Sequence, residues 1–438
     1  MKARLIPLYF DPGRDSEFDQ QMGVLRSLLA EEAEFLPEQP LGTAMPDADA
    51  VIFPQILGQA YRQLDHFKAL KLPILLVTSE FGTVSMWDWE IASYLRGEDV
   101  ATIAPYNLEQ ARQVCRALSL RRQLKQSKLL VFQDNPGAGF QPSIFKRFYW
   151  WEDECTQRIA DQFGIRVIKK SFKALGNLAK SIPEKEAEAE AARRQILTSQ
   201  VSGRALLSAL KLYLAVKQEI ESEGNVMAAG INCLNESHFS DTTPCLAWNL
   251  LFEEEGLLWG CEADTVTMLT KTILYQSLHA PIMMSNLYPF LMGQAALKHE
   301  HIPEFPNLPE PENCILAAHC GYLGVLPVSF ATEWQLKPKV LAIVDDNATA
   351  IDARLPQGEL TLAKLNPGMD QISVVEATLE SYVQYTNSDC LNGAVIRVPD
   401  GRKLMRRLDS HHYLLLSGHL RAEIELVADV FGIKVKEI

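Results

Sequence analysis

The sequence lacks the cysteine patterns that mark a disulfide framework or a zinc ribbon. It has 8 cysteines in 438 residues, and no two of them form a Cys-x-x-Cys pair. Cysteines this sparse are typical of reduced intracellular thiols. No apolar run approaches the ~20 residues of a membrane span. The first apolar run, in MKARLIPLYF, is too short for a signal peptide and no small-residue cleavage site follows it. We therefore expect a cytoplasmic protein that does not enter a membrane.

Basic charge is also scarce. The formal net charge is −13, and this argues against a nucleic-acid surface, which needs a basic stripe. There is no Gly-x-Ser-x-Gly nucleophile motif, no phosphate-cradling glycine-rich loop and no internal repeat. The composition instead suits a small neutral ligand, or one whose charge a metal ion neutralises.

Short apolar runs alternate with helical patterns through the first two thirds of the chain. The runs LIPLYF, LPILLVTS, KLLVF and NVMAAGINC are typical of buried parallel strands. After Cys314 the helical patterns thin out, and VLAIVDD, GELTLAKLN, ISVVEATLESYVQY and NGAVIRVP predict antiparallel strands. The predicted fold class is α/β, with two open parallel-sheet (Rossmann-like) domains followed by a β-rich, barrel-like C-terminal domain. The length fits three domains, which we place at 1–124, 125–310 and 311–438.

Three groups of residues are candidates for chemistry. Glu262 and Asp264 lie where a predicted strand runs into a helix, and ligands gather at the carboxyl ends of such strands. Carboxylates there can hold a hard cation or move a proton, although Asp264 alternatively caps the helix. His319 ends a predicted strand as a metal ligand or as a buried core histidine. His411 and His412 are adjacent, so only one of them can face a given site if they lie on a strand.

Aromatic residues beside acids form a further group. Trp87, next to Asp88, suits the apolar face of a sugar ring, and core packing or a subunit interface is the alternative.

The order of these motifs resembles the L-fucose/L-arabinose isomerase superfamily. An acidic strand-to-helix motif (GCEAD) is followed by PIMMSN, a proline-rich loop, a strand ending in HCG, a β-rich stretch and finally HHY. The resemblance covers about residues 230–438 and is looser before that. It implies an aldose–ketose isomerase that works through an enediol with a divalent cation, usually Mn²⁺. It also implies a homo-oligomer, a trimer or a hexamer, that binds a small sugar or sugar derivative.

Within this resemblance Glu262, His319 and His412 match metal ligands of the family, and Glu262 also matches a proton-transfer group. His411 would contact substrate. The position of the second family carboxylate holds Asn286 here. An amide oxygen can ligate a metal but cannot act as a base. Asp264, or Glu236, would then have to supply the missing acid.

Two functions therefore remain open. One is an isomerase that uses Glu262 and Asp264. The other is a divergent family member that binds a sugar without isomerising it. A sulfosugar isomerase would need a basic pocket, for which a cluster near His411 is a candidate, although a solvated surface segment is the alternative: Arg402, Lys403, Arg406 and Arg407.

Overall fold

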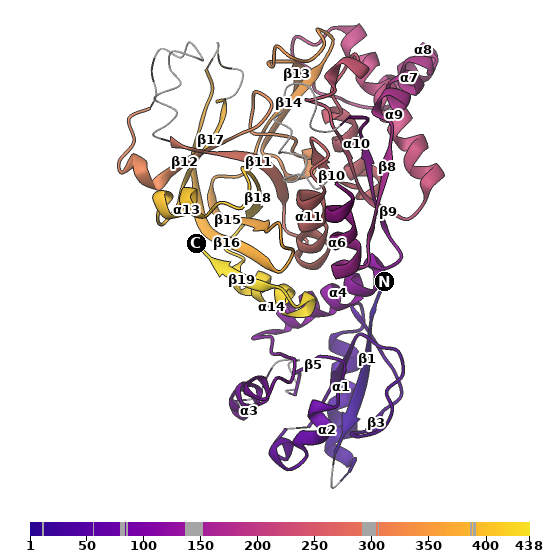
Figure 1. Ribbon diagram of the computed structural model, residues 1–438, viewed down its shortest axis with the longest axis vertical. Helices are drawn as coiled ribbons and strands as arrows, with labels where there is room; N and C mark the ends of the chain where they lie inside the picture. The colour runs from indigo at the N-terminus through magenta and orange to yellow at the C-terminus, as the bar shows by residue number, and fades with distance from the viewer. Residues whose placement is uncertain are drawn as a thin grey trace. The chain divides into compact units, whose positions relative to one another are not determined.

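The computed structural model describes residues 1–10, 13–55, 57–78, 84, 86–135, 152–290, 304, 306–385, 388 and 391–438 (Figure 1). These residues form two compact units. Unit 1 comprises Met1–Lys125, Gln276–His279 and Ala422–Lys434, and unit 2 comprises Gln126–Tyr275, Ala280–Arg421 and Val435–Ile438. Each unit is described by itself.

Unit 1 is built on a parallel sheet in the order β2-β1-β4-β5-β6, with β3 also paired to β1. Its strands are β1 (Ala3–Tyr9), β2 (Ala33–Phe35), β3 (Gln39–Pro40), β4 (Ala50–Ile52), β5 (Ile74–Leu75) and β6 (Thr102–Ile103). Its helices are α1 (Ser16–Leu28), η1 (Ala60–Arg62), α2 (Leu64–Lys68), α3 (Met86–Gly97), α4 (Leu108–Leu124) and α14 (Arg421–Phe431). Asp15 and Asn107 cap α1 and α4 by accepting hydrogen bonds from backbone N–H groups of the first turn.

Unit 2 begins with a second parallel sheet, in the order β10-β9-β7-β8. Its strands are β7 (Lys128–Phe132), β8 (Arg166–Lys170), β9 (Val226–Ile231) and β10 (Leu258–Cys261). The helical elements around it are α6 (Asp153–Phe163), α7 (Phe172–Ser181), α8 (Glu184–Arg193), α9 (Gly203–Glu223), η2 (Ser237–Phe239), α10 (Cys245–Glu255) and α11 (Thr265–Leu278).

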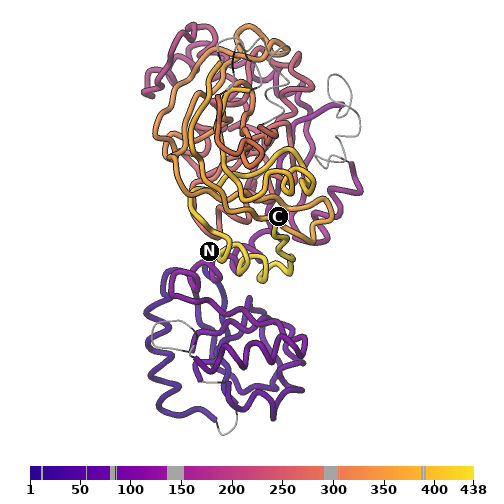
Figure 2. The backbone as a smooth tube through the Cα atoms, turned by 90° about the vertical axis from the view of Figure 1, so that its left-hand side faces the viewer, coloured from indigo at the N-terminus to yellow at the C-terminus, as the bar shows by residue number. Residues whose placement is uncertain are grey.

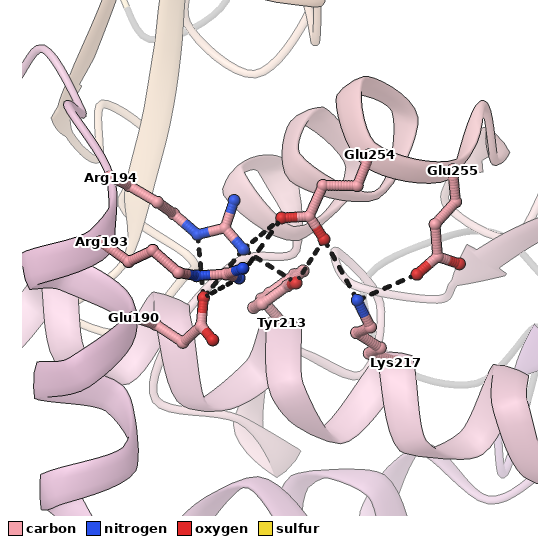
Figure 3. Close-up of polar contacts among 7 residues, drawn as sticks. All are labelled: Glu190, Arg193, Arg194, Tyr213, Lys217, Glu254 and Glu255. Atoms are coloured by element: carbon pink, nitrogen blue, oxygen red, sulfur yellow. Dashed lines mark hydrogen bonds and ion pairs between the residues drawn. The ribbon is translucent and has the colours of Figure 1, made fainter.

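A polar network around Tyr213 ties α8, α9 and α10 together (Figure 3). The Tyr213 hydroxyl donates to Glu254 Oε2 at 2.6 Å, and Lys217 Nζ lies 3.2 Å from the same oxygen. Arg194, directly after α8, forms ion pairs with Glu190 and Glu254. These contacts hold α10 against α8 and α9.

The rest of unit 2 is a closed antiparallel barrel of six strands. The strands follow the order β15-β18-β11-β12-β17-β16, and the pairing of β15 with β16 closes the ring. β19 extends the sheet at β16, and β13 and β14 pair separately. The bounds are β11 (Ile282–Pro289), η3 (Pro311–Asn313), β12 (Cys314–Ala318), η4 (Val328–Phe330), β13 (Glu333–Pro338), β14 (Thr349–Arg354), β15 (Gly358–Leu365), β16 (Gln371–Val383), β17 (Gly393–Arg397), α13 (Gly401–Arg407), β18 (His412–Ser417) and β19 (Lys434–Glu437).

The predicted fold class is confirmed at the level of a mixed α/β protein with two parallel sheets and an antiparallel barrel. The second sheet and the barrel, which we expected in separate domains, lie in one compact unit. Figure 1 shows α11 between them, and Figure 2 views unit 2 from the side of the barrel. β11, which we had assigned to the second domain, pairs with β12 and β18 and is a barrel strand.

One predicted strand is wrong. VLAIVDD (340–346) has the composition of a strand but forms none, and Val340, Leu341 and Val344 instead line a cavity. Across the described ranges, no helix is both long enough and apolar enough to cross a bilayer.

Candidate metal centre

The turn between β10 and α11 presents Glu262 in a strained conformation. Glu262 and Ala263 both have φ of 55°, in the left-handed region that side chains rarely adopt. Gly260 permits this turn, because a Cβ there would lie 2.8 Å from the backbone oxygen of Asp264. Strain at two successive non-glycine residues costs on the order of 1–3 kcal/mol each. The fold therefore holds Glu262 in place against a local energetic preference.

Glu262 meets two histidines from the barrel. His319 Nε2 lies 3.5 Å from Glu262 Oε1, and His412 Nε2 lies 3.7 Å from the same oxygen. One ligand atom from each of the three residues falls within 4.8 Å of the others, and all three residues are buried. Ligand atoms around a tetrahedral ion with bonds of about 2.1 Å are roughly 3.4 Å apart, so the spacing matches a metal site. Two histidines and one carboxylate are a ligand set that holds divalent ions while leaving coordination positions open.

Asp264 contacts the ring nitrogen of His412 that faces away from Glu262. Its Oδ2 lies 2.9 Å from His412 Nδ1 and 3.1 Å from Lys364 Nζ. Its Oδ1 accepts from the Thr267 backbone N–H at 2.8 Å, which makes Asp264 the N-cap of α11. The structure thus shows the helix cap that we had given as the alternative to a catalytic role for Asp264. Because Asp264 is a carboxylate, His412 Nδ1 is the donor, and this leaves His412 Nε2 directed toward Glu262.

The charges of the site keep Glu262 ionised and His319 neutral. Burial would raise the pKa of Glu262, but the nearby histidines, His412 first, lower it to about 2. Burial lowers the pKa of His319 to about 4, against the opposing effect of Glu262. Burial likewise lowers the pKa of His411 to about 3, helped by His412. An ionised carboxylate and a neutral imidazole are protonation states that bind a cation. His412 differs, because burial would lower its pKa but Asp264 and Glu262 raise it, so His412 has to release a proton to bind a cation.

Asn286 lies next to His412 on the adjacent barrel strand. Asn286 on β11 pairs with His412 on β18 and with Ala318 on β12, directly before His319. Residues opposite each other in an antiparallel pair project from the same face of a sheet. The Asn286 side chain donates to the Tyr288 hydroxyl at 3.2 Å, and its buried Oδ1 has no hydrogen-bond partner within the described ranges. The Asn286 side chain therefore lies on the same face of the sheet as His412, with an amide oxygen that has no hydrogen-bond partner in the described part of the chain.

The other predicted residues lie elsewhere or in other roles. The His411 ring lies beside the His412 ring, 4.3 Å between centroids, just before β18. Trp87 is on α3 of unit 1 and is 60% exposed, and its role in substrate binding stays a prediction.

Glu236 accepts hydrogen bonds from the backbone of Asp134 and Asn135, so it holds a loop. The basic cluster of residues 402–407 is on α13, with its four charged side chains exposed.

Two buried lysines were not anticipated. Lys364 lies on β15 and forms the ion pair with Asp264. Lys271 is the only charged residue of α11, its Nζ has no hydrogen-bond partner within the described ranges, and it lies 3.7 Å from the centre of the Trp259 ring. Burial lowers the pKa of Lys271 to about 7. The sequence signal for Lys271 is a lone lysine in an otherwise uncharged helix.

A cavity borders the turn that carries Glu262. Cys261 and Cys320, the neighbours of Glu262 and His319 in sequence, line it together with Cys233 and Cys245. Burial raises the pKa of the Cys233 thiol to about 12 and that of Cys245 to about 11, so these thiols are protonated and are poor nucleophiles. The one charged residue of the lining, Lys339, is paired with Asp346. The cavity walls therefore present no unpaired charge.

Comparison with known proteins assigns no family to this chain. No protein-family model matches the sequence, and no curated protein matches it either. The case for a function therefore rests on the site itself.

Proposed function

We propose that this chain is a metal-dependent sugar isomerase of the L-fucose/L-arabinose isomerase type, which interconverts an aldose and a ketose through an enediol. One observation carries the proposal: Glu262, His319 and His412 come from three distant segments and meet as a buried group with metal-ligand spacing. The same three residues match metal ligands of that superfamily in the sequence resemblance.

Glu262, His319 and His412 would hold the ion, with the Asn286 oxygen as a further ligand. A bound divalent cation, Mn²⁺ or another, would polarise the carbonyl of an open-chain sugar and so favour loss of a proton from the neighbouring carbon. Glu262 is the carboxylate that would take this proton.

We assign Asp264 to orienting His412, although the sequence had suggested it as the second acid. Its oxygens are already engaged with His412, Lys364 and Thr267. It is also completely buried. A carboxylate in that position sets the geometry of a ligand and is poorly placed to exchange protons with a substrate.

A sugar-binding protein without isomerase activity is the second candidate. Asn286 favours it, because the site then contains a single carboxylate free to move a proton. The two functions share the metal site and differ in proton transfer, so separate measurements distinguish them.

The metal site is tested by thermal unfolding with and without Mn²⁺, for the wild type and Glu262→Gln. A ligand at a hundredfold excess over Kd stabilises the folded state by about 2.7 kcal/mol. We expect Mn²⁺ to stabilise the wild type and the control Glu219→Gln, whose carboxylate pairs with Lys170 on β8, and not to stabilise Glu262→Gln. Equal shifts in all three proteins, or none with Mn²⁺, Co²⁺ or Zn²⁺, would refute the metal site.

Proton transfer is tested by incubating neutral aldoses and ketoses with the metal-loaded protein in D₂O. Isomerisation through an enediol incorporates deuterium next to the carbonyl carbon, which NMR detects even when turnover is slow. Incorporation that disappears in Glu262→Gln supports the isomerase. Sugar binding without any incorporation supports the binding protein.

A further inference from the structure

We infer that Lys364 is a positioning residue of the metal centre, acting through Asp264 on the ligand His412. The inference rests on the metal site proposed above. Lys364 lies on β15, 100 residues beyond Asp264 in the chain. Nothing in the sequence of β15 indicates that this lysine reaches the site.

Lys364 is buried and makes two polar contacts, both to the start of α11. Its Nζ donates to Asp264 Oδ2 at 3.1 Å and to the Thr267 hydroxyl. Its exposed fraction is 1%. Burying a lysine is costly unless it is paired, so the ammonium group and the carboxylate depend on each other.

The contacts of Asp264 are divided in a way that fixes its orientation. Oδ1 accepts from the Thr267 backbone N–H, whereas Oδ2 accepts from the Thr267 hydroxyl at 2.7 Å, from Lys364 and from His412 Nδ1. Three donors converge on Oδ2. Without Lys364, Asp264 Oδ2, which holds the His412 ring, would lose its contact with a buried ammonium group.

The charge of Lys364 also determines which carboxylate is available to a cation. The buried site contains two carboxylates, Glu262 and Asp264, and the ammonium group of Lys364 offsets the charge of Asp264. Glu262 is then the carboxylate whose charge remains for an ion. Groups that orient a metal-ligating histidine typically change metal affinity by about 10–100-fold when removed.

A purely structural role, tying α11 to the barrel, is the competing explanation. It predicts that Lys364→Met lowers the stability of the metal-free protein but leaves the metal affinity of the folded protein unchanged. A positioning role predicts a change in the affinity and in the coordination geometry of the folded protein.

The experiment measures Mn²⁺ affinity by calorimetry and Co²⁺ coordination by visible absorption, at a temperature where each variant is folded. We expect Lys364→Met to bind Mn²⁺ at least tenfold more weakly, with a changed Co²⁺ spectrum. The control is Lys170→Met on β8, which removes a lysine paired with Glu219 and Glu223 of α9. This control should match the wild type.

Thr267→Val keeps the shape and the charges but removes the hydroxyl that bonds both Lys364 and Asp264, so it decides the question if Lys364→Met does not fold. We expect it to weaken Mn²⁺ binding severalfold. Wild-type affinity and spectrum in a folded Lys364→Met, or in Thr267→Val when that variant must decide, would overturn the inference. Absence of Mn²⁺ and Co²⁺ binding by the wild type would instead refute the proposed function, and the inference with it.

Discussion

Replacing Lys271 by methionine should make the metal-free protein more stable, by an amount that depends on pH. Lys271 is fully buried on α11, and burial lowers its pKa from 10.5 to about 7. Between these two pH values the unfolded state binds a proton that the folded state does not. Stability must therefore rise with pH across this range, by about 1.4 kcal/mol per pH unit.

The magnitude follows from the two pKa values. At pH 7 the lysine costs about 4 kcal/mol relative to a group that does not titrate, and at pH 9 it costs about 2 kcal/mol. Methionine has a similar length and no charge to desolvate. We expect Lys271→Met to be more stable than the wild type by about these amounts, with the difference shrinking as the pH rises.

The assay is urea unfolding followed by tryptophan fluorescence, in EDTA and a reducing agent, from pH 6.5 to 9. Comparing two variants at each pH cancels the titration of all other groups. Leu274→Met, at a buried position one turn further along α11, is the control and should show no pH-dependent difference. A Lys271→Met variant that is less stable than the wild type, by an amount independent of pH, would refute the reasoning.

Three further variants test the site. Asn286→Asp adds a carboxylate opposite His412 and should tighten Mn²⁺ binding tenfold or more, about 1.4 kcal/mol, by calorimetry; unchanged affinity would exclude Asn286 as a ligand. Gly260→Ala places a Cβ 2.8 Å from the Asp264 backbone oxygen and should cost roughly 1–3 kcal/mol in urea unfolding, whereas Gly203→Ala, with nothing within 4 Å, should not. His319→Leu should abolish stabilisation by Mn²⁺ without destabilising the metal-free protein, and a loss of several kcal/mol without metal would show a structural histidine instead.

The parts of the site that follow from sequence are those set by strand ends. Glu262 follows β10, His319 follows β12 and His412 opens β18, and a strand end is recognisable from an apolar run and the polar residue after it. Asp264 as a helix cap is equally local. Strand ends made these residues candidates, and the resemblance to the isomerase superfamily supplied their expected roles as metal ligands.

The parts that did not follow depend on pairing between distant segments. β11 contains Asn286 and ends at Pro289, and only its pairing with β12 and β18 makes it a barrel strand. Lys364 contacts Asp264 because β15 pairs with β18 and because α11 lies against the barrel. A single sequence contains no signal for such contacts, since nothing near Lys364 in the chain distinguishes it from a surface lysine.

His319 is the residue whose surroundings most directly favour the proposed metal site over ordinary core packing. A core histidine is expected to satisfy its ring nitrogens, since an unsatisfied buried polar group costs about 1–3 kcal/mol. Both ring nitrogens of His319 are buried, and within the described ranges neither has a hydrogen-bond partner. The strained backbone at Glu262 and Ala263 adds a second cost at the same place. An ion bound between Glu262 and His319 would give His319 Nε2 a partner, and the backbone strain at Glu262 is the kind that occurs at ligand sites.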